Sequence, residues 1–259
     1  MSTISIVSWN VNGLRAVYQK GFMQWFEHTQ PGILCLQETK CSAEQLPPEL
    51  CIIPGYQVHY SSGERKGYSG TALISKPQPL EVTYGMGIAE FDGEGRLIIA
   101  RYPDFTLANC YFPNGKASPE RLRYKLGFYE AFEQHLAARR KGGERFIVTG
   151  DVNTAHQPID LAHPKQNEKI SGFLPEERAW MDRFLAAGYV DVFRHLYPDK
   201  LAYTWWDMRT GARARDVGWR LDYFLLDREL LPRVVSTTIQ KEVMGSDHCP
   251  VALELEVRS

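Results

Sequence analysis

The chain has 259 residues, of which 44% are hydrophobic and 24% are charged, and these values are ordinary for a chain that buries a substantial core. They exclude disordered, collagenous and fibrous proteins. With 30 Lys and Arg against 31 Asp and Glu, the net charge is -1, so no overall basic field indicates binding to nucleic acid or to an anionic membrane. The overall charge does not exclude a basic patch on one face of the protein.

Neither a membrane helix nor a disulfide framework is expected. No run approaches the roughly 18 apolar residues that a membrane helix needs, and residues 1–7 lack the pattern of a signal peptide, so we expect a cytoplasmic protein. The five cysteines are odd in number and form no C-x-x-C pair, which argues against disulfides and structural zinc. We expect Cys35 and Cys110, which lie in apolar runs, to be reduced and packed in the core.

The first half of the chain is predicted to consist mainly of short strands. Apolar runs bounded by Gly, Pro and Asn indicate strands at 4–9, 33–36, 57–60, 71–75, 97–101 and 107–112. A helix is expected over 17–28, where apolar residues recur near helical spacing after a turn at 10–13. Apart from this helix, the pattern is that of a β-meander.

The second half combines strands with two longer helices. Apolar residues recur every three or four positions between 119 and 139, which predicts an amphipathic helix that ends near Gly142. A second helix is expected at 175–187, with Pro175 at its start and Gly188 at its end. Strands are predicted at 145–149 and 220–226, and a final pair lies around 235–243 and 251–257.

These elements favour an α/β fold in one domain over residues 1–259, because no linker or low-complexity tract interrupts them. Strands followed by helices in each half, without strict βαβ alternation, predict two sheets packed face to face with helices outside. The halves resemble crude duplicates. Each begins with an apolar strand that ends in an Asn-containing turn, at Asn10 and at 150–153.

Polar side chains gather where the apolar strands stop. They are Asn10, Asn12, Glu38, Tyr111, Asn114, Asp151, Asn153, Asp222, Asp247 and His248. One such residue is usually a turn or capping residue, but this number of them predicts a site at one sheet edge. Oxygen ligands with no cysteine and a single histidine suit Mg²⁺ or Mn²⁺ rather than zinc. His248 beside Asp247 is typical of a proton carrier or of a group that stabilises charge on a phosphoryl oxygen.

Seven stretches of the sequence resemble, in order, the motifs of the exonuclease III family of apurinic/apyrimidinic (AP) endonucleases. They are 9–15 (WNVNGLR), 36–40 (LQETK), 67–70 (GYSG), 111–114 (YFPN), 150–153 (GDVN), 218–223 (GWRLDY) and 246–250 (SDHCP). Each stretch alone is a weak signal, whereas all seven in order are a strong one. The residues by themselves predicted the type of metal and the strand-end site, but not the substrate.

The resemblance implies a four-layer α/β/β/α sandwich of two packed mixed β-sheets with helices outside, and a divalent metal ion. It implies an enzyme for DNA repair that hydrolyses the phosphodiester 5′ to abasic sites in duplex DNA, with accompanying 3′-phosphodiesterase and 3′→5′ exonuclease activity. An abasic nucleotide has no base to unstack, so extruding it costs less than flipping an intact one. A monomer that associates with DNA of the nucleoid is the expectation that follows.

Carried over residue by residue, the resemblance implies that Glu38 is the principal metal ligand. Asn10 lies beside it, and Asp247 is a further candidate ligand. Bound metal would neutralise charge on the phosphate or the leaving oxygen.

The resemblance also implies the catalytic roles. Asp151 orients or deprotonates the attacking water, and Asn153 donates to the phosphoryl oxygens. His248 binds a non-bridging oxygen and is held in its tautomer by Asp222, while Tyr111 offers its hydroxyl to the scissile phosphate or the leaving group. The identity of the general base stays open.

Recognition of DNA is implied at a pocket and along the backbone. Trp205, Trp219 and Leu221 match the apolar wall of the family's abasic pocket, whereas Trp206 is expected in the core. Residues that match DNA contacts are Arg15, Lys40, Arg65, Tyr68, Asn114 and Asn167, with Arg209 as a candidate wedge.

The sequence departs from the family pattern at two positions. Ile170 stands where relatives often have a second Asn, and Ala117 where some carry an Arg. The best candidate for a basic patch is the segment 203–222, which carries Arg209, Arg213, Arg215 and Arg220 and is diluted by Asp207 and Asp216.

Other functions stay open as alternatives. One alternative is an enzyme that acts chiefly as a 3′→5′ exonuclease. Another is a relative from the same superfamily that acts on phosphoinositides, sphingomyelin or undamaged DNA, since the same residues serve any phosphoester. A non-catalytic DNA-binding protein would lack a catalytic side chain, yet every expected position is filled. A zinc protease is disfavoured because the sequence has no H-E-x-x-H helix.

Overall fold

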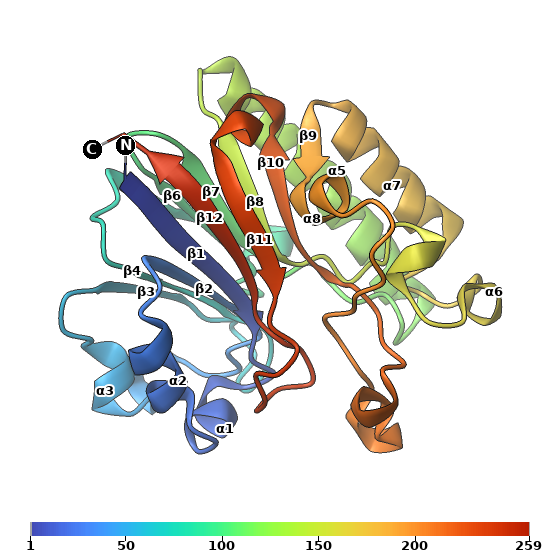
Figure 1. The fold of residues 1–259 in the computed structure, drawn as a ribbon, viewed down its shortest axis with the longest axis horizontal. Helices are drawn as coiled ribbons and strands as arrows, with labels where there is room; N and C mark the ends of the chain where they lie inside the picture. Colours follow the sequence, from blue (N-terminus) through green and yellow to red (C-terminus); the bar gives the residue numbers. More distant parts are fainter. Residues whose placement is uncertain (1, 259) are drawn as a thin grey trace.

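Two six-stranded β-sheets packed face to face form the centre of the computed structural model, which describes residues 2–258 (Figure 1). The first sheet has the order β11-β12-β1-β2-β4-β3. Its strands are β1 (Ser2–Asn10), β2 (Ile33–Gln37), β3 (Gln57–Ser61), β4 (Thr71–Ser75), β11 (Val234–Ile239) and β12 (Val251–Val257).

The second sheet has the order β5-β6-β7-β8-β10-β9. Its strands are β5 (Glu81–Tyr84), β6 (Leu97–Arg101), β7 (Thr106–Cys110), β8 (Phe146–Asp151), β9 (Tyr189–Asp191) and β10 (Asp222–Asp227). In each sheet the third and fourth strands of the order are parallel, β1 with β2 and β7 with β8, and the other neighbours are antiparallel. Both sheets are therefore mixed and repeat one pairing pattern.

This repeat has a different register from the one that the sequence suggested. The comparison of Asn10 with 150–153 equates β1 with β8, whereas the strand orders equate β1 with β7 and β2 with β8. The sequence comparison was wrong on this point because a polar strand end marks the shared edge of both sheets, not equivalent strands.

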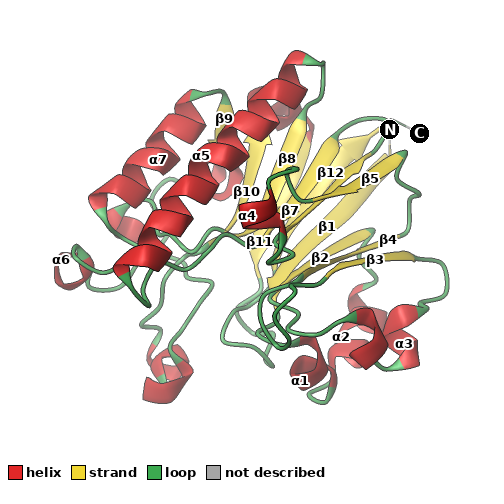
Figure 2. Ribbon diagram, turned by 180° about the vertical axis from the view of Figure 1, so that it is seen from behind, coloured by secondary structure: helices red, strands yellow, loops and turns green. Residues whose placement is uncertain are grey.

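Helices cover the outer face of each sheet, as Figure 2 shows from behind. The longer ones are α2 (Phe22–Thr29), α5 (Pro119–Lys141) and α7 (Pro175–Ala186). The shorter ones are α1 (Leu14–Tyr18), α3 (Pro48–Cys51), α4 (Ala89–Asp92), α6 (Pro164–Asn167) and α8 (Val192–Leu196). Short 3₁₀ helices lie at Ala43–Gln45, Pro158–Asp160, Met208–Thr210, Ala212–Arg215 and Arg228–Arg233.

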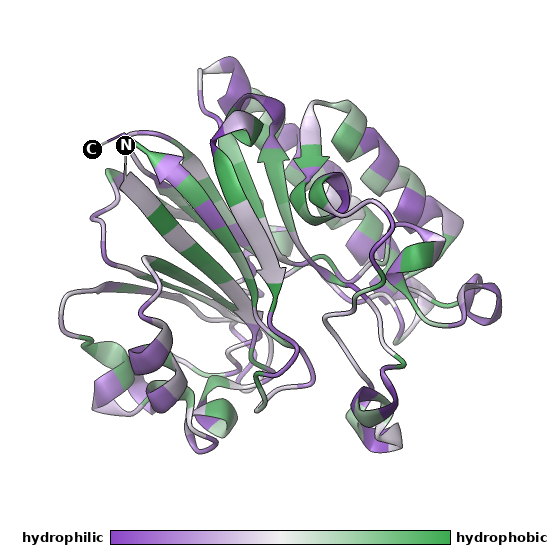
Figure 3. Cartoon of the chain, viewed as in Figure 1, coloured by the Kyte–Doolittle hydropathy of each residue, from purple (hydrophilic) through white to green (hydrophobic). Residues whose placement is uncertain are grey.

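Three apolar cores separate the resulting layers. One lies between the sheets and includes Ile6, Leu73, Leu107 and Leu253. A second joins the outer face of the second sheet to α5 and α7, and a third joins the first sheet to α1, α2 and α3. Figure 3 shows hydrophobic colour gathered on strands such as β10 and hydrophilic colour on α6. This arrangement confirms the expected α/β/β/α sandwich.

Local differences from the predicted elements have local causes. The helix expected at 17–28 is split into α1 and α2, because Gly21 adopts a left-handed conformation with φ 95° and starts a new helix. Strands β5 and β9 were not predicted, and the strand expected at 235–243 ends at Ile239. Cys35 and Cys110 are free and buried, as predicted. Within residues 2–258, no helix has the length and apolar character needed to cross a membrane.

Candidate active site

The strand-end residues meet at one edge of the sandwich because the strands that carry them are neighbours. Beyond β1 and β2 the parallel pairing continues, with Val11 N donating to Gln37 O at 3.0 Å and Gly13 N to Glu38 O at 2.8 Å. Glu38 adopts φ 58°, a left-handed conformation that is unusual for a side chain of its size. Such local strain is typical of functional sites, where the surrounding fold holds the residue in place.

The second sheet brings two carboxylates to the same edge. Asp151 at the end of β8 lies directly opposite Asp222 at the start of the antiparallel strand β10. Before it, Gly150 has φ 131°, and a Cβ there would lie 2.0 Å from the carbonyl oxygen of Cys110 on β7. Only glycine permits this close approach, and it fixes where Asp151 leaves the sheet.

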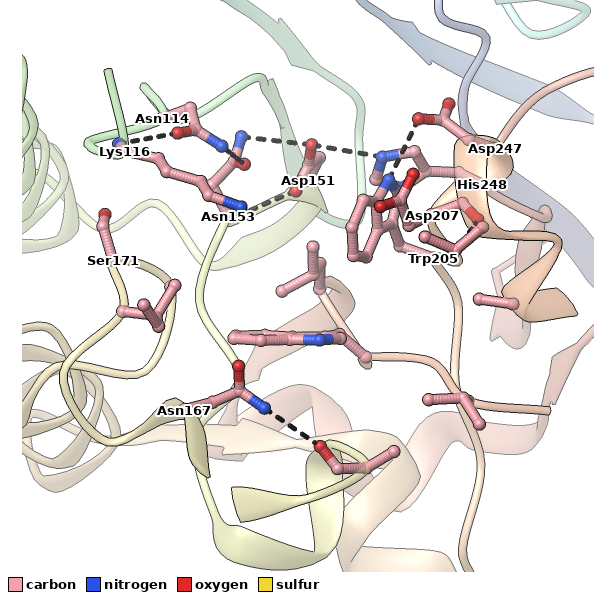
Figure 4. A pocket seen from close by; sticks show the side chains of 18 of the residues that line it. Asn114, Lys116, Asp151, Asn153, Asn167, Ser171, Trp205, Asp207, Asp247 and His248 are labelled. Atoms are coloured by element: carbon pink, nitrogen blue, oxygen red, sulfur yellow. Dashed lines mark hydrogen bonds and ion pairs between the residues drawn. The ribbon is translucent and has the colours of Figure 1, made fainter. Parts of the chain in front are cut away.

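His248 lies between these two carboxylates. Its Nδ1 is 2.7 Å from Asp222 Oδ2, and its Nε2 is 3.7 Å from Asp151 Oδ2. The backbone is held as well, since Trp9 Nε1 donates to His248 O at 3.1 Å and His248 N donates to Ser246 Oγ at 3.2 Å. We call Asp151, Asp222 and His248 the Asp151 cluster; its potential ligand atoms lie within 4.8 Å of one another. Figure 4 shows two of its members, Asp151 and His248.

Burial and charge shift the protonation of this cluster in definite directions. Burial raises the pKa of Asp151 to about 7, against the opposing charge of His248. Burial alone would lower the pKa of His248, but the negative charges of Asp222 and Asp151 outweigh it and raise that pKa to about 10. At neutral pH the imidazole therefore carries a proton on both nitrogens, and Asp151 is close to its own titration point.

Asn10 connects the Asp151 cluster to Glu38. Its Nδ2 donates to Glu38 Oε2 at 3.0 Å and to Asp151 Oδ2 at 2.9 Å, while its Oδ1 accepts from Asn12 N at 3.0 Å. In this conformation Asn10 bridges two carboxylates as a hydrogen-bond donor. Lys40 Nζ lies 2.9 Å from Glu38 Oε1 and also contacts Asn12 Oδ1, which orients the outer side of the carboxylate.

Asp247 is fixed by donors from both sides of the site. Its Oδ1 accepts from Asn12 Nδ2 at 2.9 Å, and its Oδ2 accepts from Trp205 Nε1 at 3.0 Å. Burial opposes its charge, but His248 and these two donors lower the pKa of Asp247 below its usual value. Asp247 is therefore a permanent carboxylate next to His248.

The donor set fits a hard divalent cation. Four carboxylates converge here, those of Glu38, Asp151, Asp222 and Asp247, and only Lys40 and His248 bring positive charge among the contacts described above. Asp222 Oδ1 is buried and has no hydrogen-bond partner among residues 2–258. Excess negative charge and oxygen ligands are the chemistry that Mg²⁺ or Mn²⁺ requires.

Two further donors flank Asp151. Asn153 N donates to Asp151 Oδ1 at 2.8 Å, and Asn114 Nδ2 donates to Asn153 Oδ1 at 2.9 Å, so that the three side chains form a row (Figure 4). Tyr111 lines the same cleft beneath the guanidinium of Arg96, 4.6 Å from the ring centre. Burial, together with the charge of Glu38, raises the pKa of Tyr111 well above its ordinary value, so its hydroxyl keeps its proton and can donate.

A cleft of about 610 Å³ opens over this row. Its apolar wall is formed by Trp205, Trp219 and Leu221, and the two indole rings meet edge to face at a centroid distance of 6.5 Å. Twelve of the residues to which the sequence assigned a role in the site line it, namely Glu38, Tyr111, Asn114, Asp151, Asn153, Asn167, Trp205, Arg209, Trp219, Leu221, Asp247 and His248. Asn10 and Asp222 lie beneath, in contact with lining residues.

The remaining predicted DNA contacts lie outside the cleft lining. Arg15 and Arg65 are exposed, and Lys40 contacts Glu38. The hydroxyl of Tyr68 accepts from Arg96 at 3.1 Å and from Arg121 at 2.9 Å. Their roles toward DNA stay predictions.

Positions at which the sequence departs from the family pattern have different surroundings. Ile170 is partly exposed and lines the cleft near Asn167, whereas Ala117 is exposed and does not line it. Trp206 is 1% exposed, as expected of a core residue.

The predicted basic patch at 203–222 is corrected by the structure. Arg220 is buried and forms ion pairs with Asp160 at 2.8 Å and with Asp191 at 2.6 Å. Arg213 packs over Trp206 and donates to the carbonyl oxygen of Ser246. Arg209 and Arg215 alone remain as exposed arginines that line the cleft, because a pattern of charges does not reveal which of them find internal partners.

Some residues that shape the site were not identified from the sequence. Asn12 was named among the strand-end residues but received no role, although it bonds to Asp247 and Lys40. Lys125 is completely buried and donates to the backbone of Asn153. Its place in the apolar stripe of the helix predicted at 119–139 was a signal that could have found it, since a lysine there must have buried partners.

Comparisons with known proteins agree with this geometry. A model of the Endonuclease/Exonuclease/phosphatase family matches residues 7–248. DNA repair nuclease APEX1 of Danio rerio is 45% identical over 259 residues, which cover 99% of this chain and 83% of that protein. The exodeoxyribonuclease of Bacillus subtilis (strain 168) is 43% identical over 258 residues, 98% of this chain and 100% of that protein. The crystal structure of AP endonuclease LMAP from Leishmania major is similar with a TM-score of 0.90 at 30% identity, covering 99% of this chain and 88% of that chain.

Proposed function

Because the chain belongs to the endonuclease/exonuclease/phosphatase family and is a DNA repair nuclease of the exonuclease III type, we propose that its main substrate is duplex DNA with an abasic site. The bond cleaved is the phosphodiester 5′ to that site, which leaves a 3′-hydroxyl and a 5′-deoxyribose phosphate. Removal of blocked 3′ ends and 3′→5′ exonuclease activity accompany this reaction. One observation carries the proposal: an apolar wall of two indoles and a leucine stands beside a row of phosphate-directed polar groups in one cleft.

The enzyme depends on a divalent metal ion, and we assign it Mg²⁺ or Mn²⁺. Glu38 would hold the ion, with Asn10 and Asp247 as the neighbouring candidates and the oxygens of the Asp151 cluster within the same group of carboxylates. When bound, such an ion neutralises charge on the phosphate and on the leaving oxygen.

Asp151 is proposed as the residue that orients and deprotonates the attacking water. A carboxylate whose pKa lies near 7 is suited to a general base at neutral pH, since it is largely ionised and still basic enough to accept a proton. His248 does not fit this role, because a pKa near 10 keeps it protonated. The imidazolium instead donates to a non-bridging oxygen, and Asp222 holds it in place through Nδ1.

Asn153 and Tyr111 are proposed as donors to the phosphoryl and leaving oxygens. The Nδ2 of Asn153 donates to the carbonyl of Phe112 at 2.9 Å and to Asp151 Oδ2 at 3.2 Å, so both of its hydrogens are engaged. Donation to the phosphate would replace the longer bond to Asp151, while the bond to Phe112 keeps the amide in place. Tyr111 keeps its proton for the reasons given above. Positioned donors in a partly dry cleft account for much of the barrier reduction in phosphoryl transfer.

Selection of the abasic site follows from the shape of the cleft. Trp205, Trp219 and Leu221 form an apolar wall in the cleft, which suits a bare sugar and is proposed to exclude a sugar that carries a base. Arg209, exposed beside the cleft, is assigned to the gap that an extruded sugar leaves in the duplex. Arg15, Lys40, Arg65, Tyr68, Asn114 and Asn167 are assigned to the DNA backbone.

A second candidate function is that of an enzyme acting chiefly as a 3′→5′ exonuclease. Ile170 favours it, because this apolar side chain at the cleft rim cannot make the hydrogen bond to DNA that an Asn at that position offers. We further propose that the protein acts as a monomer in the cytoplasm, where its substrate associates it with DNA of the nucleoid.

The test is cleavage of a duplex that carries one central abasic analogue, resolved on a denaturing gel. We expect a single incision 5′ to the lesion with Mg²⁺, no incision with EDTA, and none with Glu38→Ala. Lys200→Ala is the matched control, since Lys200 lies at a separate pocket and should leave the rate unchanged. Degradation only from 3′ ends would support the exonuclease instead, and an intact abasic duplex would contradict the proposal.

A further inference from the structure

A completely buried ion pair lies behind the cleft, between the two outer helices of the second sheet. Lys125 on α5 and Glu177 on α7 are both 0% exposed, and Nζ lies 2.7 Å from Oε1. Removing two charges from water is costly, and an apolar pair of similar volume often gives equal stability. The contacts that this pair makes are therefore of more interest than its contribution to folding.

Lys125 contacts the turn that follows β8. Its Nζ donates to Asn153 O at 2.7 Å and to Thr154 Oγ1 at 2.9 Å. Thr154 is held again from the same helix, because its hydroxyl lies 2.7 Å from that of Tyr129. The ammonium group thus fixes the backbone of Asn153, whose side chain is directed to Asp151 in the cleft.

Glu177 contacts a neighbouring segment of the same cleft. Its Oε2 accepts from Gly172 N at 2.6 Å and from Leu174 N at 3.0 Å, and its Oε1 accepts from Ser171 Oγ at 2.7 Å. Ser171 and Gly172 line the cleft, so the carboxylate fixes one of its rims from behind.

Gly172 connects this rim to the apolar wall. Its φ of 102° is left-handed, and a Cβ there would lie 3.2 Å from the Trp219 ring and 3.4 Å from Asn153 O. Its carbonyl accepts from Ala155 N at 2.8 Å, which ties the rim to the turn after β8. The backbone of Gly172 therefore fills the space between the indole wall and the polar row.

We propose that the Lys125–Glu177 pair is a positioning device that sets the spacing between the phosphate-directed Asn153 and the sugar-pocket wall at Trp219. This inference rests on the proposed function, because the spacing matters only if sugar and phosphate are bound together. By holding the turn at Asn153 and the segment at Gly172 from behind, the pair adjusts the cleft to an abasic nucleotide and favours it over an intact one. Small misplacements of a few tenths of an ångström to 1 Å are enough to slow such reactions by up to about 100-fold.

Packing of the two helices does not need this pair. Tyr129 and Trp180 stack at a centroid distance of 4.0 Å between α5 and α7, within an extensive aromatic core. A second ion pair, Glu130 with Arg183, joins the same two helices at the surface. It touches no residue of the cleft and provides a matched control.

The experiment compares three proteins with the wild type. The double variant Lys125→Met with Glu177→Gln removes the charge pair without leaving a lone buried charge. The single variant Lys125→Arg keeps a cation at this position. The control, Glu130→Gln with Arg183→Met, removes the surface pair. Steady-state kinetics on abasic duplex and the 3′→5′ exonuclease rate on intact duplex are measured with each. Hydrogen exchange of the peptide that contains Gly172 and Leu174 is followed by mass spectrometry, well below each melting temperature.

For the double variant we expect kcat on abasic duplex to fall about 10- to 100-fold, with KM changed less than about threefold. The ratio of abasic incision to exonuclease rate should fall as well, and the 172–174 amides should exchange faster. Lys125→Arg should recover most of kcat, and the surface control should match the wild type.

The proposal would be overturned if the double variant folds and keeps the wild-type kcat, the wild-type ratio of abasic incision to exonuclease rate, and the wild-type hydrogen exchange at 172–174. A lower melting temperature would not change this conclusion, because the pair would then contribute to stability alone. If the double variant does not fold, Glu177→Gln alone gives the same kinetic and exchange readouts, since its amide oxygen still accepts from one backbone N–H. Failure of the proposed function is distinguishable: the wild type would then not incise abasic duplex, whereas hydrogen exchange at 172–174 would still report on positioning.

Discussion

Two buried clusters in this molecule each contain two aspartates, and they differ in the positive charge that accompanies them. In the Asp151 cluster, two carboxylates share a single histidine, which lies 2.7 Å from Asp222 and 3.7 Å from Asp151. One oxygen of Asp222 has no hydrogen-bond partner within residues 2–258. Burial raises the pKa of Asp151 to about 7, so this carboxylate is held in an unfavourable charged state.

The second group, which we call the Arg220 cluster, lies beside strand β9 of the same sheet and contains Asp160, Asp191, Arg194 and Arg220. Two guanidinium groups accompany its two carboxylates, and Arg220 contacts both aspartates. Burial opposes the charge of Asp160, yet the charge of Arg220 outweighs it and holds the pKa of Asp160 below its usual value.

The difference shows how one residue type acquires two functions. A buried aspartate with a complete set of counter-charges is a structural anion, whereas a buried aspartate that lacks one positive charge is a base and part of a cation site. The missing charge in the Asp151 cluster is of the sign that a divalent ion brings. Three substitutions separate the two situations.

The largest effect is expected for Asp151→Asn. Removing the proposed base should lower the rate of incision by about 1,000-fold or more, because general-base contributions reach that size. The melting temperature should change little, because the relief from burying a charge is opposed by the loss of one oxygen that accepts from Asn10 or Asn153. Gel-based incision assays and calorimetry in EDTA measure the two quantities. A rate within tenfold of the wild type would remove Asp151 from the chemistry.

The opposite result is expected for Arg220→Met. Loss of this cation leaves two buried aspartates short of positive charge, and the free energy of unfolding should fall by about 3 to 5 kcal/mol. Urea unfolding followed by fluorescence measures the loss. Below the unfolding transition, kcat should stay within about threefold of the wild type. A variant that is stable but inactive would place Arg220 in the active site after all.

The smallest effect concerns pH. With Asp151 as the base, kcat should rise with pH as its carboxyl group loses a proton, with a midpoint at or below pH 7 because a bound divalent cation lowers that pKa further. In His248→Asn the positive charge that favours the carboxylate is absent, so the midpoint should move up by about one unit. Rates measured from pH 5 to 9 at saturating Mg²⁺ test this shift. An unchanged midpoint would mean that the rise of kcat with pH reports the titration of another group.

Much of the fold was predictable because strands have a strong local signal. Apolar runs bounded by turn residues located most of the strands of both sheets to within a few residues. The edge strands β5 and β9 were missed, since strands of only four and three residues are too short to carry a clear pattern. Gly21 divided a predicted helix through its own φ angle, a choice that periodicity does not report.

The site was predictable where strand ends determine it, and not where tertiary partners do. Asp151 and Asp222 were identified because each lies at a strand end, and the antiparallel register brings them together. Arg220 was misassigned to a basic surface, since its partners Asp160 and Asp191 lie far away in the sequence. Lys125 was missed for the same reason: its acidic partner is on another helix, 52 positions along the chain.

The pairing of the outermost strands of the chain has a consequence for synthesis. β1 pairs with β12 from Ser2 opposite Val257 to Ser8 opposite Val251, and the two ends of the chain lie side by side (Figure 1). Asn10 is the last residue of β1, while Asp247 and His248 lie shortly before β12. During synthesis, β1 therefore cannot pair with β12 until β12 has left the ribosome. The nascent chain cannot bring Asn10 together with Asp247 and His248 before the segment up to β12 has been synthesised.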